Sequence, residues 1–165
     1  MIFVMVGTHE QAFNRLIVFV DNLKKQNIIK EDVIIQTGFC TYEPQFCKCS
    51  KLLPYDEIVN LVAEAHIVIT HGGPSSFIMP LQIGKIPIVV PRKKQFDEHV
   101  NNHQVEFSKV VSERQGNIIV VEEMDKLENI ILHYDDIVSE MTSGINSNNA
   151  KFNEQFDKIV HDLFK

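Results

Sequence analysis

Small, flexible and hydroxyl-bearing residues gather at one point in the middle of the chain. The apolar, β-branched run 67–69 leads through Thr70 into His71, Gly72, Gly73, Pro74, Ser75 and Ser76, and a helical spacing of apolar residues follows. This order predicts a strand, a tight glycine loop and a helix N-terminus, where α/β proteins bind phosphorylated ligands. Glycines let backbone N–H groups approach a diphosphate, and the helix dipole favours its charge. A glycine turn with a serine cap and no ligand is the alternative interpretation.

A second polar cluster, residues 7–10, follows the first apolar run of the chain. Parallel strands place their following loops at one edge of the sheet, so we expect this cluster beside the glycine loop. His9 and Glu10 can take a proton from an attacking hydroxyl group, or they can orient a diphosphate. Alternatively, Glu10 simply opens the first helix.

Two histidines, His99 and His103, have the four-residue spacing of a metal-binding pair on a helix. Glu98 precedes His99 instead of following it, so the His-Glu-x-x-His pattern is missing, and no Asp-x-Asp occurs in the chain. We therefore expect no metal and no cofactor. The basic residues 92–94 either contact phosphates or form a solvated turn.

Strand and helix patterns alternate along the whole chain. The predicted strands are 2–6, 33–35, 51–53, 67–69, 86–90 and 118–121, with a loop at 39–50, and the predicted helices are 13–25, 56–65, 75–83, 98–111, 125–132 and 151–164. Strands that are apolar throughout predict a parallel sheet covered on both faces. The predicted fold class is therefore α/β, a doubly wound, Rossmann-like domain over residues 1–142, with a polar linker and an amphipathic helix at 143–165.

Composition excludes several classes of function. The 165 residues suit one globular domain, with 44% hydrophobic and 23% charged residues. A net charge of −6 argues against nucleic-acid binding. No apolar run approaches the roughly 20 residues of a membrane span. Three cysteines and no export signal predict free thiols and a cytoplasmic chain.

Four stretches together resemble one specific family: residues 6–10, 70–73, 84–91 and 98–104. In this order they are similar to the C-terminal, donor-binding domain of GT-B glycosyltransferases of the MurG type, glycosyltransferase family 28. The sequence resembles most its free-standing single-domain form, the PssE, EpsF and CpsG proteins of bacterial polysaccharide clusters. The eukaryotic counterpart is the catalytic subunit of the split UDP-N-acetylglucosamine transferase of dolichol-linked glycan synthesis. The resemblance covers residues 1–125.

The resemblance implies a site for each part of a UDP-sugar donor. The nucleotide diphosphate would be held by Gly7, Thr8, His71, Gly72, Gly73, Pro74, Ser75 and Ser76. Asp97, Glu98 and His99 fall where relatives hydrogen-bond the hexose, and carboxylates are natural acceptors for paired sugar hydroxyls. Asp97 capping a helix that begins at Glu98 is a compatible alternative. Relatives grip the ribose with a glutamate where this chain has Met79, so the ribose contact stays open.

A GT-B active site lies between two Rossmann domains, and this sequence supplies one. The resemblance implies a membrane-associated partner of the PssD, EpsE or CpsF type, which would bind a lipid-linked sugar acceptor. We expect inverting transfer of a hexose, with galactose as the expected sugar, in capsule or exopolysaccharide synthesis. The chain would be cytoplasmic and recruited to the inner face of the cell membrane by that partner. The terminal helix at 151–164 is expected to contact the partner, unless it packs on its own sheet.

Two other functions are compatible with the sequence. The chain could be a non-catalytic accessory subunit of such a transferase, which the methionine at position 79 would allow. It could also be an unrelated nucleotide-binding enzyme with a Rossmann fold. This last interpretation lacks support, because residues 7–12 do not form the Gly-x-Gly-x-x-Gly fingerprint after the first strand.

Overall fold

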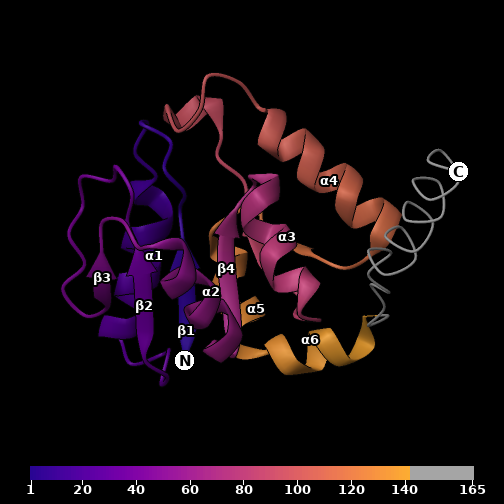
Figure 1. The fold of residues 1–165 in the computed structure, drawn as a ribbon, viewed down its shortest axis with the longest axis horizontal. Helices are drawn as coiled ribbons and strands as arrows, with labels where there is room; N and C mark the ends of the chain where they lie inside the picture. Colours follow the sequence, from indigo (N-terminus) through magenta and orange to yellow (C-terminus); the bar gives the residue numbers. More distant parts are fainter. Residues whose placement is uncertain (142–165) are drawn as a thin grey trace, which may run out of the picture.

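Short runs of valine and isoleucine form a parallel six-stranded sheet in the computed structural model, which describes residues 1–141 (Figure 1). The strands run in the spatial order β3-β2-β1-β4-β5-β6. Their bounds are Ile2–Met5 (β1), Val33–Gln36 (β2), Lys48–Ser50 (β3), Ile67–His71 (β4), Ile88–Val90 (β5) and Ile119–Val120 (β6). All five strand pairs are parallel, as expected when a helix or a long loop connects consecutive strands.

Helices cover both faces of this sheet (Figure 1). Their bounds are Asn14–Lys25 (α1), Tyr55–Glu64 (α2), Pro74–Gln82 (α3), His103–Gln115 (α4), Asp125–Leu132 (α5) and Tyr134–Glu140 (α6), with a short 3₁₀ turn at Lys94–Phe96 (η1). Alternate residues of β1 point to opposite faces, as the pleat of a strand requires. Ile2 and Val4 pack with α1 and α5, whereas Phe3 and Met5 pack against α2. Helices α3 and α4 cover the β5 end of that second face.

The order of the strands defines where a ligand can bind. The chain runs outward from β1 through β2 to β3, then returns to β4 on the other side of β1. In such sheets a crevice opens beyond the carboxyl ends of the two central strands, at the point where the strand order reverses. The segments that follow β1 and β4 begin at Val6 and Gly72, so the two predicted loops meet there.

The predicted fold class is confirmed, and the differences concern single segments. Residues 51–53 do not form a strand; β3 lies just before them, inside the segment predicted as a loop. This edge strand has exposed polar residues and no apolar pattern, so periodicity could not reveal it. Helix α6, which the sequence analysis did not predict, follows α5 directly at His133.

The helix predicted to begin at Glu98 begins instead at His103 and continues to Gln115. Asp97 adopts a left-handed conformation, with φ of 56°, and ends the 3₁₀ turn η1. It therefore does not cap a helix at Glu98, and His99 is not on the same helix as His103. The segment from η1 to α4 stands at the carboxyl edge of the sheet, near the start of α1 (Figure 1).

The prediction for the polar linker and the amphipathic helix at 143–165 lies outside the described residues. None of the helices in residues 1–141 is long and apolar enough to cross a membrane.

Candidate functional site

A cleft of about 510 Å³ opens at the carboxyl edge, between the ends of β1, β2 and β4. The lining residues fall into a polar group, here called the polar side, and a mainly apolar group, here called the apolar side. The polar side carries Gly7, Thr8, His9, Gln36, His71, Ser75 and Ser76. The apolar side carries Met5, Leu52, Leu53, Tyr55, Ile58 and Met79. The loops after β1 and β4, predicted separately from the sequence, thus form one continuous surface.

His71, the last residue of β4, is the centre of the polar side. Its ring lies between Gly7 and Gly73, so close to both that a Cβ atom on either glycine would collide with it. The backbone N–H of Gly73 donates to Nδ1 at 3.0 Å, and the Ser76 hydroxyl lies 2.9 Å from Nε2. A neutral ring that accepts at Nδ1 carries its proton at Nε2, which can therefore donate. These contacts fix the ring at the entrance to α3.

The charge of His71 is set by its surroundings. Burial, together with the nearby Arg92 guanidinium, lowers the pKa of His71 to about 4. The imidazole is therefore neutral at physiological pH, and it cannot offset a leaving group with a positive charge. It can still act as a neutral hydrogen-bond donor.

Several backbone N–H groups expected to face a diphosphate are already bonded within the protein. Gln36 Oε1 accepts from the Gly7 N–H at 3.1 Å, and Gln104 Oε1 accepts from the Gly72 N–H at 3.1 Å. The glycines therefore shape the loops instead of presenting their N–H groups. The remaining polar groups on the cleft wall that can face a diphosphate belong to Thr8, Ser75 and Ser76.

Helix α3 aims its N-terminus at the same polar side. Pro74 stands in its first turn, where a missing N–H costs nothing, and Ser75 and Ser76 follow. No side chain of residues 1–141 caps this helix end, so its partial positive charge is open to an anionic ligand.

His9 and Glu10 lie beside the cleft with different surroundings. The His9 ring lines the cleft and contacts the His99 ring edge-on, with centroids 4.9 Å apart. Burial, Arg92 and His99 lower the pKa of His9, so this ring is also neutral. The Gln11 N–H lies 3.3 Å from His9 Nδ1, an arrangement that leaves the proton on Nε2. Glu10 is exposed.

Glu98 occupies a structural position that the sequence did not reveal. Its carboxylate accepts from Arg15 Nε and Nη2, both at 2.9 Å, and from the backbone N–H of Lys93 at 3.0 Å. The residue is only 2% exposed. Both oxygens are therefore bonded inside the protein, and the expectation that Glu98 grips the sugar does not fit this arrangement.

The other two predicted sugar ligands lie close by without lining the cleft. Asp97 is exposed, and its carbonyl accepts from the Gln11 side chain at 3.1 Å. His99 reaches the cleft through its contact with His9. The structure thus brings Asp97 and His99 to the rim of the site and leaves their side chains open to solvent in part.

The basic residues 92–94 divide into two environments. Arg92 and Lys93 are buried, and Lys93 pairs with Glu123 at 2.9 Å, so the interpretation as a solvated turn fails for both. Lys94 alone is exposed. Arg92 and Gln104 hold the loops around the cleft, but sequence reasoning missed their roles. For Arg92, a signal was available in the sequence: a charged residue stands directly after a buried strand and the proline that follows the strand.

Within residues 1–141, no three His, Cys, Asp or Glu side chains converge as a metal site would require. The thiols of Cys40, Cys47 and Cys49 are free. The described part of the site therefore consists of hydroxyl, imidazole and backbone groups around an uncapped helix end.

A doubly wound domain with a polar cleft at its switch point is the kind of protein that binds nucleotides at this edge. The sequence matches the glycosyltransferase family 28 C-terminal domain over residues 1–163. The chain belongs to this family, as its motifs indicated.

The proteins similar to the chain include a curated relative and several solved structures. The UDP-N-acetylglucosamine transferase subunit ALG13 of Yarrowia lipolytica is 33% identical over 72 residues, which are 44% of this chain and 34% of the relative. The glycotransferase of kitacinnamycin has a TM-score of 0.56 at 14% identity, over 84% of this chain and 36% of that one. The glycosyltransferase SnogD from Streptomyces nogalater has a TM-score of 0.49 at 16% identity, over 85% and 40%. The chain thus matches about a third of the length of its curated relative.

Proposed function

We propose that the chain is the catalytic, UDP-sugar-binding subunit of a two-component inverting glycosyltransferase. The observation that supports this most directly is the cleft in which the loops after β1 and β4 meet the open N-terminus of α3. Membership of a family named for glycosyltransferases supports the same activity.

The two sides of the cleft suit the two ends of a nucleoside diphosphate. We assign the diphosphate to the polar side, where the Thr8, Ser75 and Ser76 hydroxyls and the helix dipole favour an anion. His9 Nε2–H is a neutral donor that suits a phosphate oxygen, while His71 Nε2–H lies against the Ser76 hydroxyl and orients that hydroxyl toward the ligand. Gly7, Gly72, Gly73 and Pro74 set the shape of this side, since their backbone groups are bonded elsewhere or absent.

The apolar side suits the nucleoside. Tyr55 is 70% exposed and Leu52 is 54% exposed, and both line the cleft. Exposed apolar side chains at a cleft wall can pack against a planar base. Met79 lies on the same wall and offers no acceptor for ribose hydroxyls, so the ribose would have to be held by another group.

For the acceptor's proton, the exposed Glu10 is our choice of general base within this chain. An inverting transfer needs a base beside the anomeric carbon. The proton on His9 Nε2 makes His9 a donor on its open side, whereas the Glu10 carboxylate can accept. We propose that Asp97 and His99, at the rim, contact the sugar, and that Glu98 supports them from below.

The other half of the active site would come from a second chain. The matched relative is named as a transferase subunit, and we propose a membrane-associated partner that binds a lipid-linked sugar. That partner would recruit this chain to the cytoplasmic face of the membrane. We propose galactose as the sugar, on the resemblance to capsule and exopolysaccharide proteins, with N-acetylglucosamine as the competing choice because the relative is named for it.

Calorimetric titration with UDP in the presence of EDTA tests the donor site. We expect binding without metal, and heat that appears only after manganese is added would contradict the metal-free site. His71→Asn should weaken binding about tenfold, because the Ser76 hydroxyl loses the ring that orients its bond to the charged diphosphate, and a lost bond to a charged group costs roughly 1.5–3 kcal/mol. An unchanged affinity would mean that the loop is structural.

Transfer itself requires the partner. Membranes that contain the co-expressed partner, this chain and labelled UDP-galactose, UDP-glucose or UDP-N-acetylglucosamine should yield a labelled lipid-linked product with one donor. Glu10→Gln should abolish product while UDP binding persists. UDP binding without turnover of any of the three donors would favour the accessory-subunit alternative.

A further inference from the structure

Arg92 is the largest fully buried side chain of the described residues, and its position is unusual for a charged group. It follows β5 by two residues, is 0% exposed, and lies with its guanidinium 4.9 Å from the centroid of the Phe13 ring. The residue therefore sits beneath the carboxyl edge of the sheet, under the loops that border the cleft.

The guanidinium connects three loop positions that are far apart in the sequence. Nη2 donates to the Val6 carbonyl at 2.8 Å, and Nη1 donates to the carbonyls of Gln11 at 2.6 Å and Glu98 at 3.1 Å. Val6 and Gln11 lie at the two ends of the loop that carries Thr8, His9 and Glu10. The planar fork of Arg92 thus sets the shape of that loop and its distance from the segment that carries Asp97 and His99.

The charge of Arg92 has no carboxylate partner in the described part of the chain. No Asp or Glu of residues 1–141 lies within ion-pair distance of Arg92, since Glu98 offers it only a carbonyl while its carboxylate binds Arg15. Arg92 Nε has no hydrogen-bond partner among these residues. The Glu98 carboxylate, which binds Arg15, still acts on the Arg92 charge without direct contact. Burying a charge without a direct counter-ion costs several kcal/mol, so an anionic ligand at the edge above would offset part of that cost.

The charge of Arg92 changes the pKa values of two histidines on the polar side of the cleft. It lowers the pKa of both His9 and His71, in addition to the larger effect of burial. His99 acts on both rings in the same direction, and the exposed Glu10 acts on His9 in the opposite one. The positive potential of Arg92 therefore reaches the polar side of the cleft, where the diphosphate was assigned.

We propose that Arg92 is a positioning residue that also gives the cleft its preference for a diphosphate over an uncharged nucleoside. The inference rests on the proposed donor site and extends it. Arg92 holds the loop that carries Thr8 and His9 through three carbonyls, and its unpaired charge favours an anion above it without direct contact.

The test compares UDP with uridine, which shares the nucleoside and lacks the charge. Wild-type protein, Arg92→Gln, Arg92→Lys and the control Lys94→Gln are titrated with both ligands by calorimetry, after thermal melting has established folding. Lys94 is a matched control because it lies two residues away, is exposed, and has only backbone hydrogen bonds among residues 1–141.

We expect Arg92→Gln to lower the affinity for UDP by about tenfold or more, with the affinity for uridine changed by less than about twofold. Arg92→Lys keeps the charge and should retain the preference for UDP within about threefold, and Lys94→Gln should change UDP binding by less than about twofold. An equal loss of both ligands in folded Arg92→Gln, or no loss of UDP, would overturn the proposal.

If Arg92→Gln does not fold, Arg92→Lys decides alone. A retained preference for UDP then supports the proposal, and loss of that preference overturns it. Failure of the wild-type protein to bind UDP would instead refute the donor site itself, an outcome that the variants cannot mimic.

Discussion

The buried ion pair between Arg15 and Glu98 predicts a large loss of stability when Glu98 is truncated. The pair joins the start of α1 to the segment before α4, 83 residues apart in the sequence. The Arg15 side chain is 17% exposed and the Glu98 side chain is 3% exposed. Glu98→Ala would leave the guanidinium without its anion and the Lys93 N–H without an acceptor.

The expected magnitude follows from these contacts. Removing one partner of a buried pair costs about 3–5 kcal/mol, and the partial exposure of Arg15 places this pair toward the lower value. The free energy of unfolding should therefore fall by about 3 kcal/mol, a large fraction of the roughly 5–15 kcal/mol of a typical domain. The double variant Arg15→Met with Glu98→Leu should lose less than the sum of the single variants, by about 1 kcal/mol or more.

Urea unfolding, followed by circular dichroism at a fixed pH, measures these differences. Glu10→Ala is the matched control: it removes an exposed carboxylate, and its stability should stay within about 0.5 kcal/mol of the wild type. If Glu98→Ala loses less than about 1 kcal/mol while sugar transfer collapses, the structural role argued for Glu98 is refuted. Glu98 would then bind the donor sugar, as the family resemblance implied.

Three further predictions concern single residues. Because the pKa of His71 is about 4, the unfolded chain binds the extra proton first, so stability should fall as pH drops from 6.5 toward 4. A His71→Asn variant should lose this dependence in thermal melts. His66 lies 2.8 Å from both Glu31 and Asp135, which raise its pKa. Its stabilising contribution should therefore be present below pH 6.5 and disappear as pH rises through the raised pKa, and His66→Gln should remove that decline. Gly73→Ala would displace the His71 ring and should weaken UDP binding about tenfold. Gly84→Ala, at an open position with φ of 78°, should cost about 1 kcal/mol of stability and leave binding intact.

The arrangement of the sheet could be predicted because it depends on local patterns. Apolar runs such as 2–6 and 67–69 identify buried strands, and parallel strands place their loops at one edge. The meeting of Gly7 with His71 therefore follows from sequence alone. The need for a glycine at position 7 does not, since the collision that excludes a Cβ atom there involves the His71 ring from another strand.

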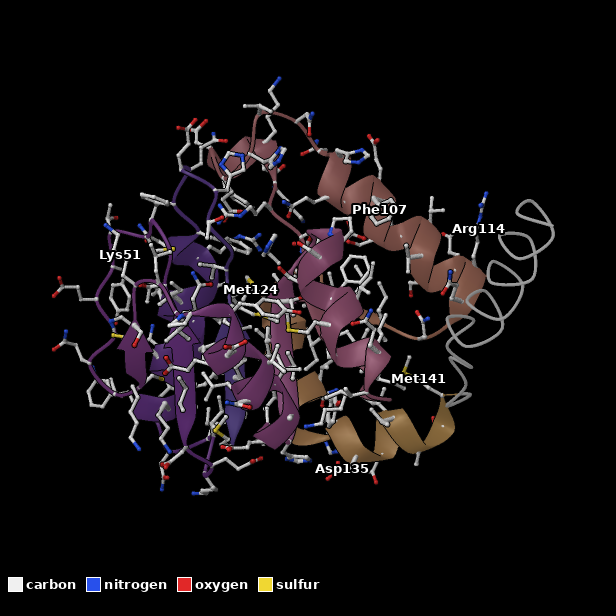
Figure 2. The ribbon with its side chains drawn as sticks, viewed as in Figure 1. Lys51, Phe107, Arg114, Met124, Asp135 and Met141 are labelled. Atoms are coloured by element: carbon white, nitrogen blue, oxygen red, sulfur yellow. The ribbon has the colours of Figure 1, made fainter. Side chains whose placement is uncertain are left out.

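The segment 92–102 shows what a single sequence could not reveal. Apolar spacing suggested a helix from Glu98, but the long-range bonds of Glu98 to Arg15 and of Arg92 to Val6 hold this segment in an irregular path. Such contacts join positions more than 80 residues apart, and no local propensity encodes them. Figure 2 shows that the side chains of this segment lie at the carboxyl edge of the sheet, near the start of α4. The charged residues of this segment that were predicted to bind the donor therefore include residues with a structural role, such as Glu98.

The central claim is that UDP binds in the cleft at the carboxyl edge, and amide chemical shifts during a UDP titration test it most directly. With isotope-labelled protein and no added metal, we expect the largest shifts at residues 7–9, 52–53, 55, 71–73 and 75–76, with saturation at a single dissociation constant. The amide signals of Ile28, Ile29 and His133, which line a separate hollow of about 320 Å³, should stay unchanged. Shifts confined to that second hollow, or no shifts at millimolar UDP, would contradict the account.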